Sequence, residues 1–239
     1  GELDRCHRMV VHVKFSDDNG RTWLPWGKGA LLPGSEAGPW SNGTYNYPET
    51  VLTPYGDHVA CFWRHKGKTG ILWSFFNGRS WSPPQQIVSS KLSEMDGAYR
   101  ATMSAVTRGK KEIFFTSTGL TSVLRFDGIA WKREPLRCED GGMLSLSGRK
   151  VLLVTAGKVN RRWRGISWAR PAKLCIYLRL PDGSWQGPKP LTGLIRLHEY
   201  RSLPGYYVPP YAPPNYVPLA WSDFDDGTIK LLKVPISQD

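Results

Sequence analysis

The chain has 239 residues, 40% hydrophobic and 22% charged, a globular composition that excludes wholesale disorder. No apolar run reaches the roughly 18 residues that a transmembrane helix needs, so the sequence predicts no membrane span. The net charge of +12 is concentrated, because residues 145–201 hold 12 Lys or Arg against 2 Asp or Glu, which gives 12 − 2 = +10. Such a region attracts a polyanion, or it is a solvated face that favours solubility, and both interpretations stay open.

Four segments along the chain each end in a turn that is followed by a tryptophan. They are VKFSDDNGRTW, LWSFFNGRSW, VLRFDGIAW and YLRLPDGSW, which end at Trp23, Trp81, Trp131 and Trp185. The tryptophans are 58, 50 and 54 residues apart. Each follows an apolar run typical of a strand, so the pattern indicates an internal repeat.

Between these tryptophans a second pattern recurs, in which a turn separates two strand-like runs. The turns PYGD, RGKK, SGRK and DDGT have the residue types of β-hairpins. Each repeat therefore predicts about four short antiparallel strands in roughly 50 residues, the period of a β-propeller blade. The predicted fold is all-β, a small single-domain propeller with four-stranded antiparallel blades.

The blade boundaries follow from the same pattern. Residues 45–90, 98–137 and 140–192 each form a full unit, whereas 9–27 supply an outer strand pair and 206–237 supply inner strands. We expect the two ends to share one blade in a ring of about four or five blades, which removes exposed sheet edges. The alternative is that an N-terminal blade is missing.

The four cysteines, Cys6, Cys61, Cys138 and Cys175, show no CxxC spacing, which disfavours zinc ribbons and thioredoxin-type motifs. Cys61 and Cys175 lie in apolar runs and are interpreted as buried thiols, while two disulfides in a secreted protein are the alternative. The chain begins with Gly and shows no signal peptide, so we expect processing or a fragment, with a secreted or periplasmic location slightly favoured.

Residues 16–23, SDDNGRTW, fit the pattern S-x-D-x-G-x-T-W at every position. This segment resembles the Asp-box, or bacterial neuraminidase repeat, of sialidase-like propellers. We expect Asp18 to accept hydrogen bonds from turn amides, Gly20 to supply the turn conformation and Trp23 to pack between sheets. The second copy has Phe76 in place of the Asp, the third keeps only its Gly and Trp, and the fourth shortens the Gly–Trp spacing. The resemblance implies the fold rather than an activity.

Inner strands of a propeller line a central funnel, so residues at their ends are the candidate ligand-binding groups. Tyr-Arg occurs twice there, as Tyr99-Arg100 and Tyr200-Arg201. Two arginines at one funnel bind a carboxylate bidentately, and the resemblance to sialidases implies that they act as two members of an arginine triad. The alternative is that they pair with nearby acidic residues and join blades together.

Glycoside cleavage needs a paired acid and base or nucleophile, and elimination from a uronate needs a base and a cation. The candidates are Glu49, Asp96 and Glu199, with Tyr47 beside them, and His198 as a base for elimination. Tyr207, in the Pro-rich stretch 203–216, is a candidate for stacking on a sugar ring. That stretch is interpreted either as a rigid funnel rim or as a packed connector.

The favoured function is a carbohydrate-active enzyme, a glycoside hydrolase or polysaccharide lyase, that cleaves an acidic glycan. The alternative is a non-catalytic, lectin-like propeller. The segments expected to line the funnel differ in sequence from one repeat to the next. This difference favours one asymmetric site and hence an enzyme. No cofactor or metal is expected. Asp223, Asp225 and Asp226 are close in sequence, but they are interpreted as part of a hairpin turn in preference to a calcium site. Nucleic acid is not favoured, because no recognition motif accompanies the charge; an oligomer is compatible with the sequence.

Overall fold

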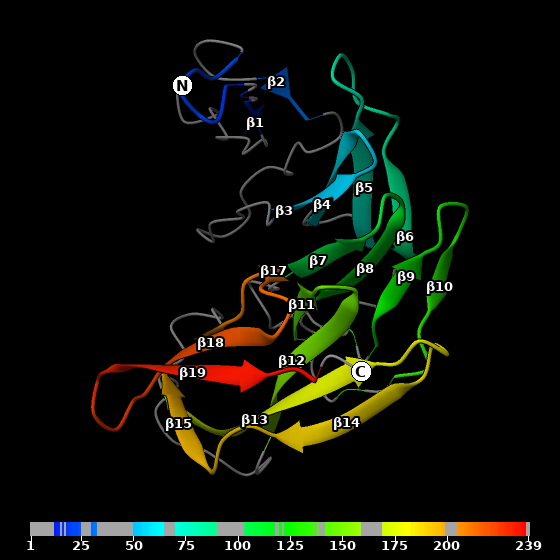
Figure 1. The fold of residues 1–239 in the computed structure, drawn as a ribbon. Coiled ribbons are helices and arrows are strands. Elements are labelled where there is room, and N and C mark those ends of the chain that lie inside the picture. Colours follow the sequence, from blue (N-terminus) through cyan, green and yellow to red (C-terminus); the bar gives the residue numbers. More distant parts are fainter. Residues whose placement is uncertain are drawn as a thin grey trace, which may run out of the picture. The chain divides into compact units, whose positions relative to one another are not determined.

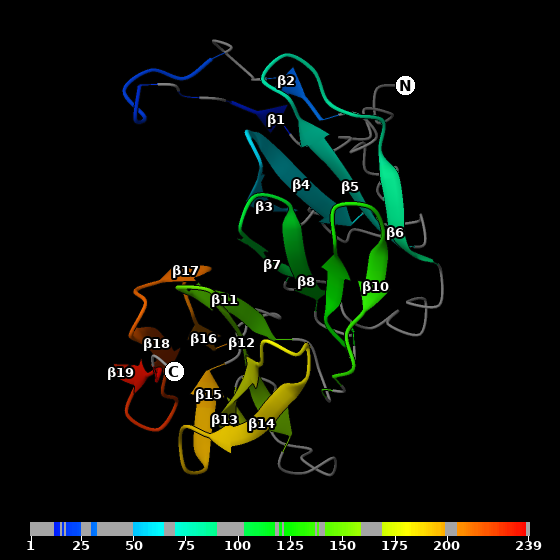
Figure 2. The ribbon, with the colours of Figure 1, turned by 45° about the vertical axis from the view of Figure 1, so that its right-hand side comes forward.

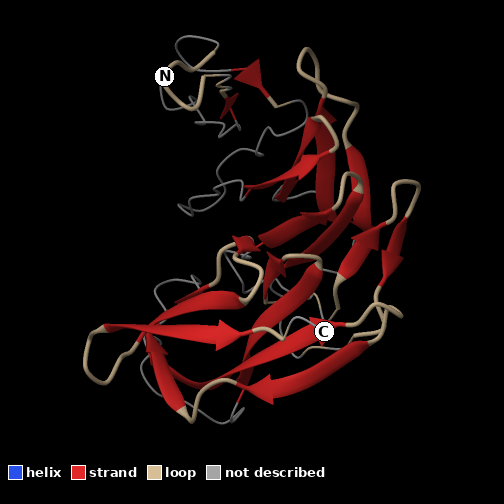
Figure 3. Ribbon diagram, in the orientation of Figure 1, coloured by secondary structure: helices blue, strands red, loops and turns tan. Residues whose placement is uncertain are grey.

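The computed structural model describes residues 12–14, 16, 18–24, 30–32, 50–64, 70–89, 103–117, 120, 122–136, 138, 142–158, 169–198 and 205–237. The strands are β1 (His12–Val13), β2 (Ala30–Leu31), β3 (Thr50–Tyr55), β4 (His58–Arg64), β5 (Gly70–Phe76), β6 (Gln85–Ser89), β7 (Met103–Arg108), β8 (Glu112–Ser117), β9 (Leu124–Phe126), β10 (Trp131–Arg133), β11 (Met143–Ser147), β12 (Lys150–Lys158), β13 (Ala169–Arg179), β14 (Trp185–Pro190), β15 (Ile195–His198), β16 (Tyr206–Tyr207), β17 (Tyr211–Ala212), β18 (Tyr216–Ser222) and β19 (Ile229–Pro235). The described residues contain strands and loops and no helix, which confirms the all-β class (Figure 3).

The chain divides into two compact units, residues 1–52 with 58–96 and residues 53–57 with 97–239. Three sheets contain four consecutive strands in chain order: β3-β4-β5-β6, β7-β8-β9-β10 and β11-β12-β13-β14 (Figure 1). Their strands lie within the predicted segments 45–90, 98–137 and 140–192. The prediction of four short antiparallel strands per repeat is therefore confirmed, while ring closure and the number of blades stay predictions.

Two kinds of glycine turn recur in these sheets. The hairpin between the first two strands has its glycine at φ 61–63°, at Gly56, Gly109 and Gly148, and Gly227 between β18 and β19 has φ 68°. The turn before each tryptophan has its glycine at φ 85–94°, at Gly20, Gly78, Gly128 and Gly183. Residues with a Cβ rarely adopt these angles, so the repeated glycines mark the predicted turns.

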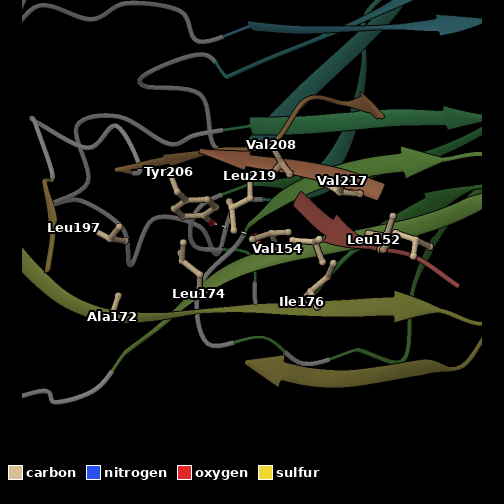
Figure 4. Packing of buried hydrophobic residues seen from close by; sticks show 12 residues of the cluster. Leu152, Val154, Ala172, Leu174, Ile176, Leu197, Tyr206, Val208, Val217 and Leu219 are labelled. Atoms are coloured by element: carbon tan, nitrogen blue, oxygen red, sulfur yellow. Dashed lines mark hydrogen bonds between the residues drawn. The ribbon is translucent and has the colours of Figure 1, made fainter. Parts of the chain in front are cut away.

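In the second unit, neighbouring sheets stack face to face. Val106 and Phe114 from β7–β10 are buried against Leu144 and Leu153 from β11–β14. The opposite face of β11–β14 is buried against β18 and β19, and Figure 4 shows Val154 and Ile176 on the facing side. Side chains alternate between the two faces of a strand, so a central sheet of this stack buries both.

The first unit has its own core. Cys61 and Trp63 of β4 are fully buried with Leu32, and Val13 and Trp81 pack against them. In the N-terminal β1–β2 pair, the first strand, His12–Val13, lies within the predicted segment 9–27. Its second strand is Ala30–Leu31, beyond the predicted limit at residue 27.

The C-terminal part differs from a simple repeat. β16, β18 and β19 form a three-stranded sheet, β17 pairs with β11 in parallel, and β15 pairs with the first residues of β13 (Figure 2). The sequence pattern did not predict these last two pairings, because each strand has at most four residues and pairs outside its own repeat.

The state of the cysteines decides between the predicted buried thiols and the predicted disulfides. Cys61 and Cys175 are free thiols, so the two-disulfide interpretation, which needs all four cysteines, is wrong. Cys61 is fully buried and burial raises the pKa of its thiol to about 12, as predicted for an inert core residue. Cys175 is only partly buried, so the prediction of a buried thiol is correct for Cys61 and wrong for Cys175.

Candidate functional site

The first strands of neighbouring sheets lie side by side in the second unit. The backbone N–H of Leu144 donates a 2.9 Å hydrogen bond to the buried Ser104 hydroxyl. Ser104 and Leu144 are each the second residue of their strand, so the N-terminal ends of β7 and β11 lie together. We call this the strand-start end of the sheets.

The strand-start end is tightly packed at β11. A Cβ at Gly142 would collide with the carbonyl oxygen of Val154, which explains the glycine directly before β11. The Tyr206 hydroxyl donates to the same carbonyl at 3.2 Å (Figure 4). Val154 pairs with Met143, so β16 also reaches this end of the sheet.

The opposite end of the first strands, which carries the hairpins of Gly56, Gly109 and Gly148, is covered by the Pro-rich segment. The Tyr211 hydroxyl accepts the Thr107 N–H at 3.1 Å and lies 2.8 Å from the Thr53 hydroxyl. The Ser147 hydroxyl donates to the Pro213 carbonyl at 2.6 Å. These bonds tie the segment to the hairpin end of the first strands, while Tyr207 and Tyr211 are 56% and 43% exposed, so both predicted roles of the segment stay open.

Most predicted site residues lie outside the described residues. These are Glu49, Asp96, Glu199, Tyr47, Arg100, Arg201, Tyr99 and Tyr200. In the sequence, Glu49 directly precedes β3 and Arg100 lies three positions before β7. Their roles as catalytic and substrate-binding groups stay predictions.

The structure describes the backbone of His198 and the whole of Tyr207. His198 ends β15 and pairs with Ala169, the first residue of β13, which puts its backbone at the strand-start end of the β11–β14 sheet. Tyr207 follows the buried Tyr206, so its side chain takes the other face of β16, and it is 56% exposed. It is free to stack on a ligand there, although it faces away from the core that Tyr206 enters.

The Asp18 turn has the hydrogen bonds that its sequence predicts. Asp18 accepts the N–H of Thr22 at 2.8 Å and the Thr22 hydroxyl at 2.6 Å, and Ser16 accepts the Gly20 N–H at 2.7 Å. These bonds, chiefly that from the Thr22 hydroxyl, lower the pKa of Asp18 to about 2. Trp23 instead differs from the prediction: its indole N–H bonds to the Gly20 carbonyl at 3.0 Å, and the side chain is 49% exposed rather than packed between sheets.

In the other three turns a side-chain oxygen also accepts backbone N–H groups, but it belongs to a different position of the turn. Asn77, Asp127 and Asp182 each accept a backbone N–H two residues later, at 2.9–3.0 Å. Each of these residues directly precedes the turn glycine, whereas Asp18 lies two residues before Gly20. The motif S-x-D-x-G-x-T-W therefore does not predict these capping residues, whereas the Asn-Gly or Asp-Gly pair before each tryptophan does indicate them.

A buried carboxylate joins the β7–β10 and β11–β14 sheets. Glu134, 5% exposed, accepts hydrogen bonds from Arg179 at 2.7 Å and from the Trp185 indole at 3.0 Å, and Arg125 pairs with it at 2.9 Å. The Arg179 guanidinium also lies 5.2 Å from the centre of the Phe114 ring. With both oxygens occupied, Glu134 is a structural link between sheets rather than a catalytic acid.

A cavity of about 690 Å³ lies between β13–β14 and β19. Its lining is largely aliphatic, including Leu178 and Val234, with Lys189 and Lys233 among the polar groups. The described residues that line it include no carboxylate, so it lacks the acid–base pair that glycoside cleavage needs. It is therefore not the candidate catalytic site.

The hairpin between β18 and β19 uses its aspartates locally. Asp223 accepts the N–H of Asp225, Asp226 accepts the N–H of Thr228, and Asp225 pairs with Arg196 at 2.8 Å. This confirms the hairpin-turn interpretation of the three aspartates. Across the described ranges, no three His, Cys, Asp or Glu side chains are grouped so as to hold a metal ion.

A scan against protein-family models and a search of curated proteins each return no match. The described part of the chain also contains no helix with the length and apolarity that crossing a membrane requires. The likeness to sialidase-like propellers therefore depends on the repeat and the Asp18 turn alone.

Proposed function

We propose that the chain is an Asp-box β-propeller of the sialidase-like type and that it cleaves a glycosidic bond in an acidic glycan. The observation that supports this most is the stacking of repeated four-stranded sheets with their first strands adjacent, as Ser104 and Leu144 are. In such a stack the segments that precede the first strands converge at one end. Those segments carry the arginines and carboxylates that the chemistry needs.

In this proposal the substrate carboxylate is bound by Arg100 and Arg201, whose planar guanidinium groups pair with it bidentately. The net charge of +12 increases the local concentration of an anionic glycan through long-range attraction. Tyr207 and Tyr99 supply aromatic surface for the sugar ring. Binding thus requires no metal ion.

Bond cleavage is assigned to the carboxylates beside these arginines. For hydrolysis, one of Glu49, Asp96 and Glu199 protonates the leaving oxygen. A second carboxylate, or Tyr47 activated by one, then activates water or attacks the anomeric carbon. For elimination from a uronate, His198 removes the proton from the carbon next to the carboxylate, and an arginine stabilises the resulting enolate. The enolate then expels the glycosidic oxygen from the adjacent carbon as a carbon–carbon double bond forms, and one of the carboxylic acids protonates that oxygen. The two routes give different products.

The test is a product screen on wild type, Arg100→Ala and Arg201→Ala. The substrates are acidic polysaccharides, aryl sialosides and aryl glucuronides, with detection of new reducing ends and of unsaturated-uronate absorbance. We expect turnover in wild type and a loss of about 100-fold or more in both variants, because each removes one charge-assisted carboxylate contact. The product identifies the hydrolase or lyase route.

Arg149→Ala is the matched control, since it removes the same charge from the same chain at the exposed hairpin end of β11. Circular dichroism checks that all variants fold. Equal turnover in all four proteins would contradict the assignment of the arginines. Binding of a glycan without turnover would replace the enzyme with the lectin-like alternative.

A further inference from the structure

The cavity between β13–β14 and β19 has the size of a small-molecule site. Its volume of about 690 Å³ falls within the roughly 300–1,000 Å³ of ligand-binding pockets. The described residues that line it run from Leu152 to Ser237 and all belong to the second unit, so its walls do not depend on how the two units are placed. The proposed glycan chemistry does not use this cavity.

The walls of the cavity are aliphatic. Ile176 and Leu178 of β13 line one side, while Leu232 and Val234 of β19 line the other and belong to the same apolar core (Figure 4). The described lining contains no aromatic side chain that would stack on a ring. Aliphatic cavities stay dry and take up apolar groups instead of water. The lining therefore favours a ligand with an alkyl chain.

One positive charge faces this cavity from β14. Lys189 pairs with Ile176 across the antiparallel β13–β14 ladder, and directly paired residues of such a ladder point to the same face of the sheet. Lys189 is also an exposed residue, whereas Ile176 is buried. A lysine in this position lays its carbon stem along the apolar wall and keeps its ammonium in water. Lys189 therefore suits the charged end of a ligand whose apolar end is inside.

The second lysine of the lining, Lys233, points away from the cavity. Leu232 and Val234 enter the core, and side chains alternate along a strand, so Lys233 lies on the opposite face of β19. Its ammonium is 4.6 Å from the centre of the Tyr216 ring. The described lining includes no carboxylate that would neutralise Lys189. The cavity thus combines an aliphatic interior with one facing cation.

We propose that this cavity binds a small amphiphile that consists of one alkyl chain and a carboxylate head group. The alkyl chain lies between Ile176, Leu178 and Val234, and the carboxylate pairs with the Lys189 ammonium. Burial of the methylenes supplies the affinity, because each one is withdrawn from water. The lysine selects the charge of the head group. This second site is independent of the proposed glycan chemistry, and either can fail without the other.

The test is the binding of straight-chain carboxylates to the full chain, followed by NMR of the Ile, Leu and Val methyl groups. Decanoate is added up to about 5 mM, which detects millimolar affinity. We expect shifts of the methyl signals of Ile176, Leu178 and Val234. Octanoate should bind about tenfold more weakly than decanoate, because it buries two fewer methylenes.

The head group is tested with two lysine variants and a neutral ligand. Lys189→Ala should weaken the binding of octanoate about fivefold, as expected for an exposed ion pair, and leave the binding of octanol within about twofold of wild type. Lys233→Ala is the matched control, because it removes the same charge from the other wall of the cavity. It should bind octanoate within about twofold of wild type, since its ammonium lies on the opposite face and acts only through screened solvent.

Four results would overturn the proposal. A cavity mouth that another part of the chain closes gives no shift of the cavity methyl groups, even at the highest decanoate concentration. Concentration-dependent shifts of the same methyl groups without ligand mean that a second copy fills the cavity. Equal affinities for octanoate and decanoate mean that the alkyl chain is not buried. Equal losses in Lys189→Ala and Lys233→Ala mean that the net charge, and not Lys189, attracts the ligand.

Discussion

The two sheet interfaces of the second unit have similar centres and different outer edges. Between β7–β10 and β11–β14 the aliphatic core ends in the Glu134–Arg179–Trp185 cluster. Between β11–β14 and β18–β19 the aliphatic core ends at the 690 Å³ cavity beside β14. The first interface joins the four-stranded sheet β7–β10 to the strands β11–β14 of a six-stranded sheet, whereas the second joins β11–β14 to the three-stranded sheet β16-β18-β19. The polar link of the first interface thus lies away from its aliphatic centre, at Glu134 after β10 and at Arg179 and Trp185 of β13 and β14.

The largest expected effect comes from removing the polar link itself. Glu134→Ala leaves the buried Arg179 charge unpaired and should lower the free energy of unfolding by about 3–5 kcal/mol. Urea unfolding measures the loss. The control is Asp225→Ala, which breaks an exposed ion pair with Arg196 and should cost less than about 1 kcal/mol. Equal losses in the two variants would mean that Glu134 does not hold the interface together.

The second prediction tests the aliphatic interface. Leu219 is 1% exposed in the core between β11–β14 and β18, so Leu219→Ala should cost about 2–5 kcal/mol through lost burial and a new cavity. Leu194→Ala makes the same change at a side chain that is 59% exposed and should stay within about 0.5 kcal/mol of wild type. A loss below about 1 kcal/mol for Leu219→Ala would show that the C-terminal sheet is not docked on β11–β14.

A smaller effect is expected at the turns that carry the repeat. Gly78 has φ 90° and open space around its Cα, so Gly78→Ala should cost about 1–2 kcal/mol from backbone strain alone. Gly193 also has open space, without a positive φ, and its replacement by Ala should be neutral or slightly stabilising. If both substitutions behave alike, the left-handed turn is not what the glycine provides.

The smallest effect concerns the pH dependence of the Asp18 turn. The pKa of Asp18 in the folded chain is about 2, below its ordinary value of 3.8, so the ionised form stabilises the turn. That contribution is fully present above about pH 4 and is lost as the pH falls through about 2. We expect the Trp23 indole N–H resonance to shift over this range in wild type and to stay constant in Asp18→Asn. A wild-type transition near pH 4 would contradict the hydrogen bonds from Thr22.

Local periodicity predicted the repeated sheets well, because hairpin glycines and turn tryptophans recur at fixed places in each unit. The capping residues of three turns were not predicted. Asn77, Asp127 and Asp182 lie one residue nearer to the turn glycine than Asp18 does, and their side chains still accept backbone N–H groups of the turn. Pairings between distant segments, such as Leu146 with Tyr211, have no local signal at all. The exposure of Trp23 depends on what surrounds it, which a motif does not encode.

The candidate site was less accessible to such reasoning than the fold. The sequence places Arg100 and Arg201 before inner strands by analogy between repeats, but the convergence of side chains depends on how the sheets stack. The long-range bond from the Leu144 N–H to Ser104, which supports convergence, joins a backbone donor to a serine that no motif singles out. Predicting it required the three-dimensional arrangement.

The most direct test of the proposed function is the affinity for an acidic oligosaccharide, measured by calorimetry with trigalacturonate and with 3′-sialyllactose. We predict that wild type binds at least one of them and that Arg100→Ala and Arg201→Ala each weaken this binding at least tenfold. Lys189→Ala, at the cavity beside β14, should bind like wild type. No binding by wild type, or equal affinity in all four proteins, would contradict an arginine-lined site for acidic glycans.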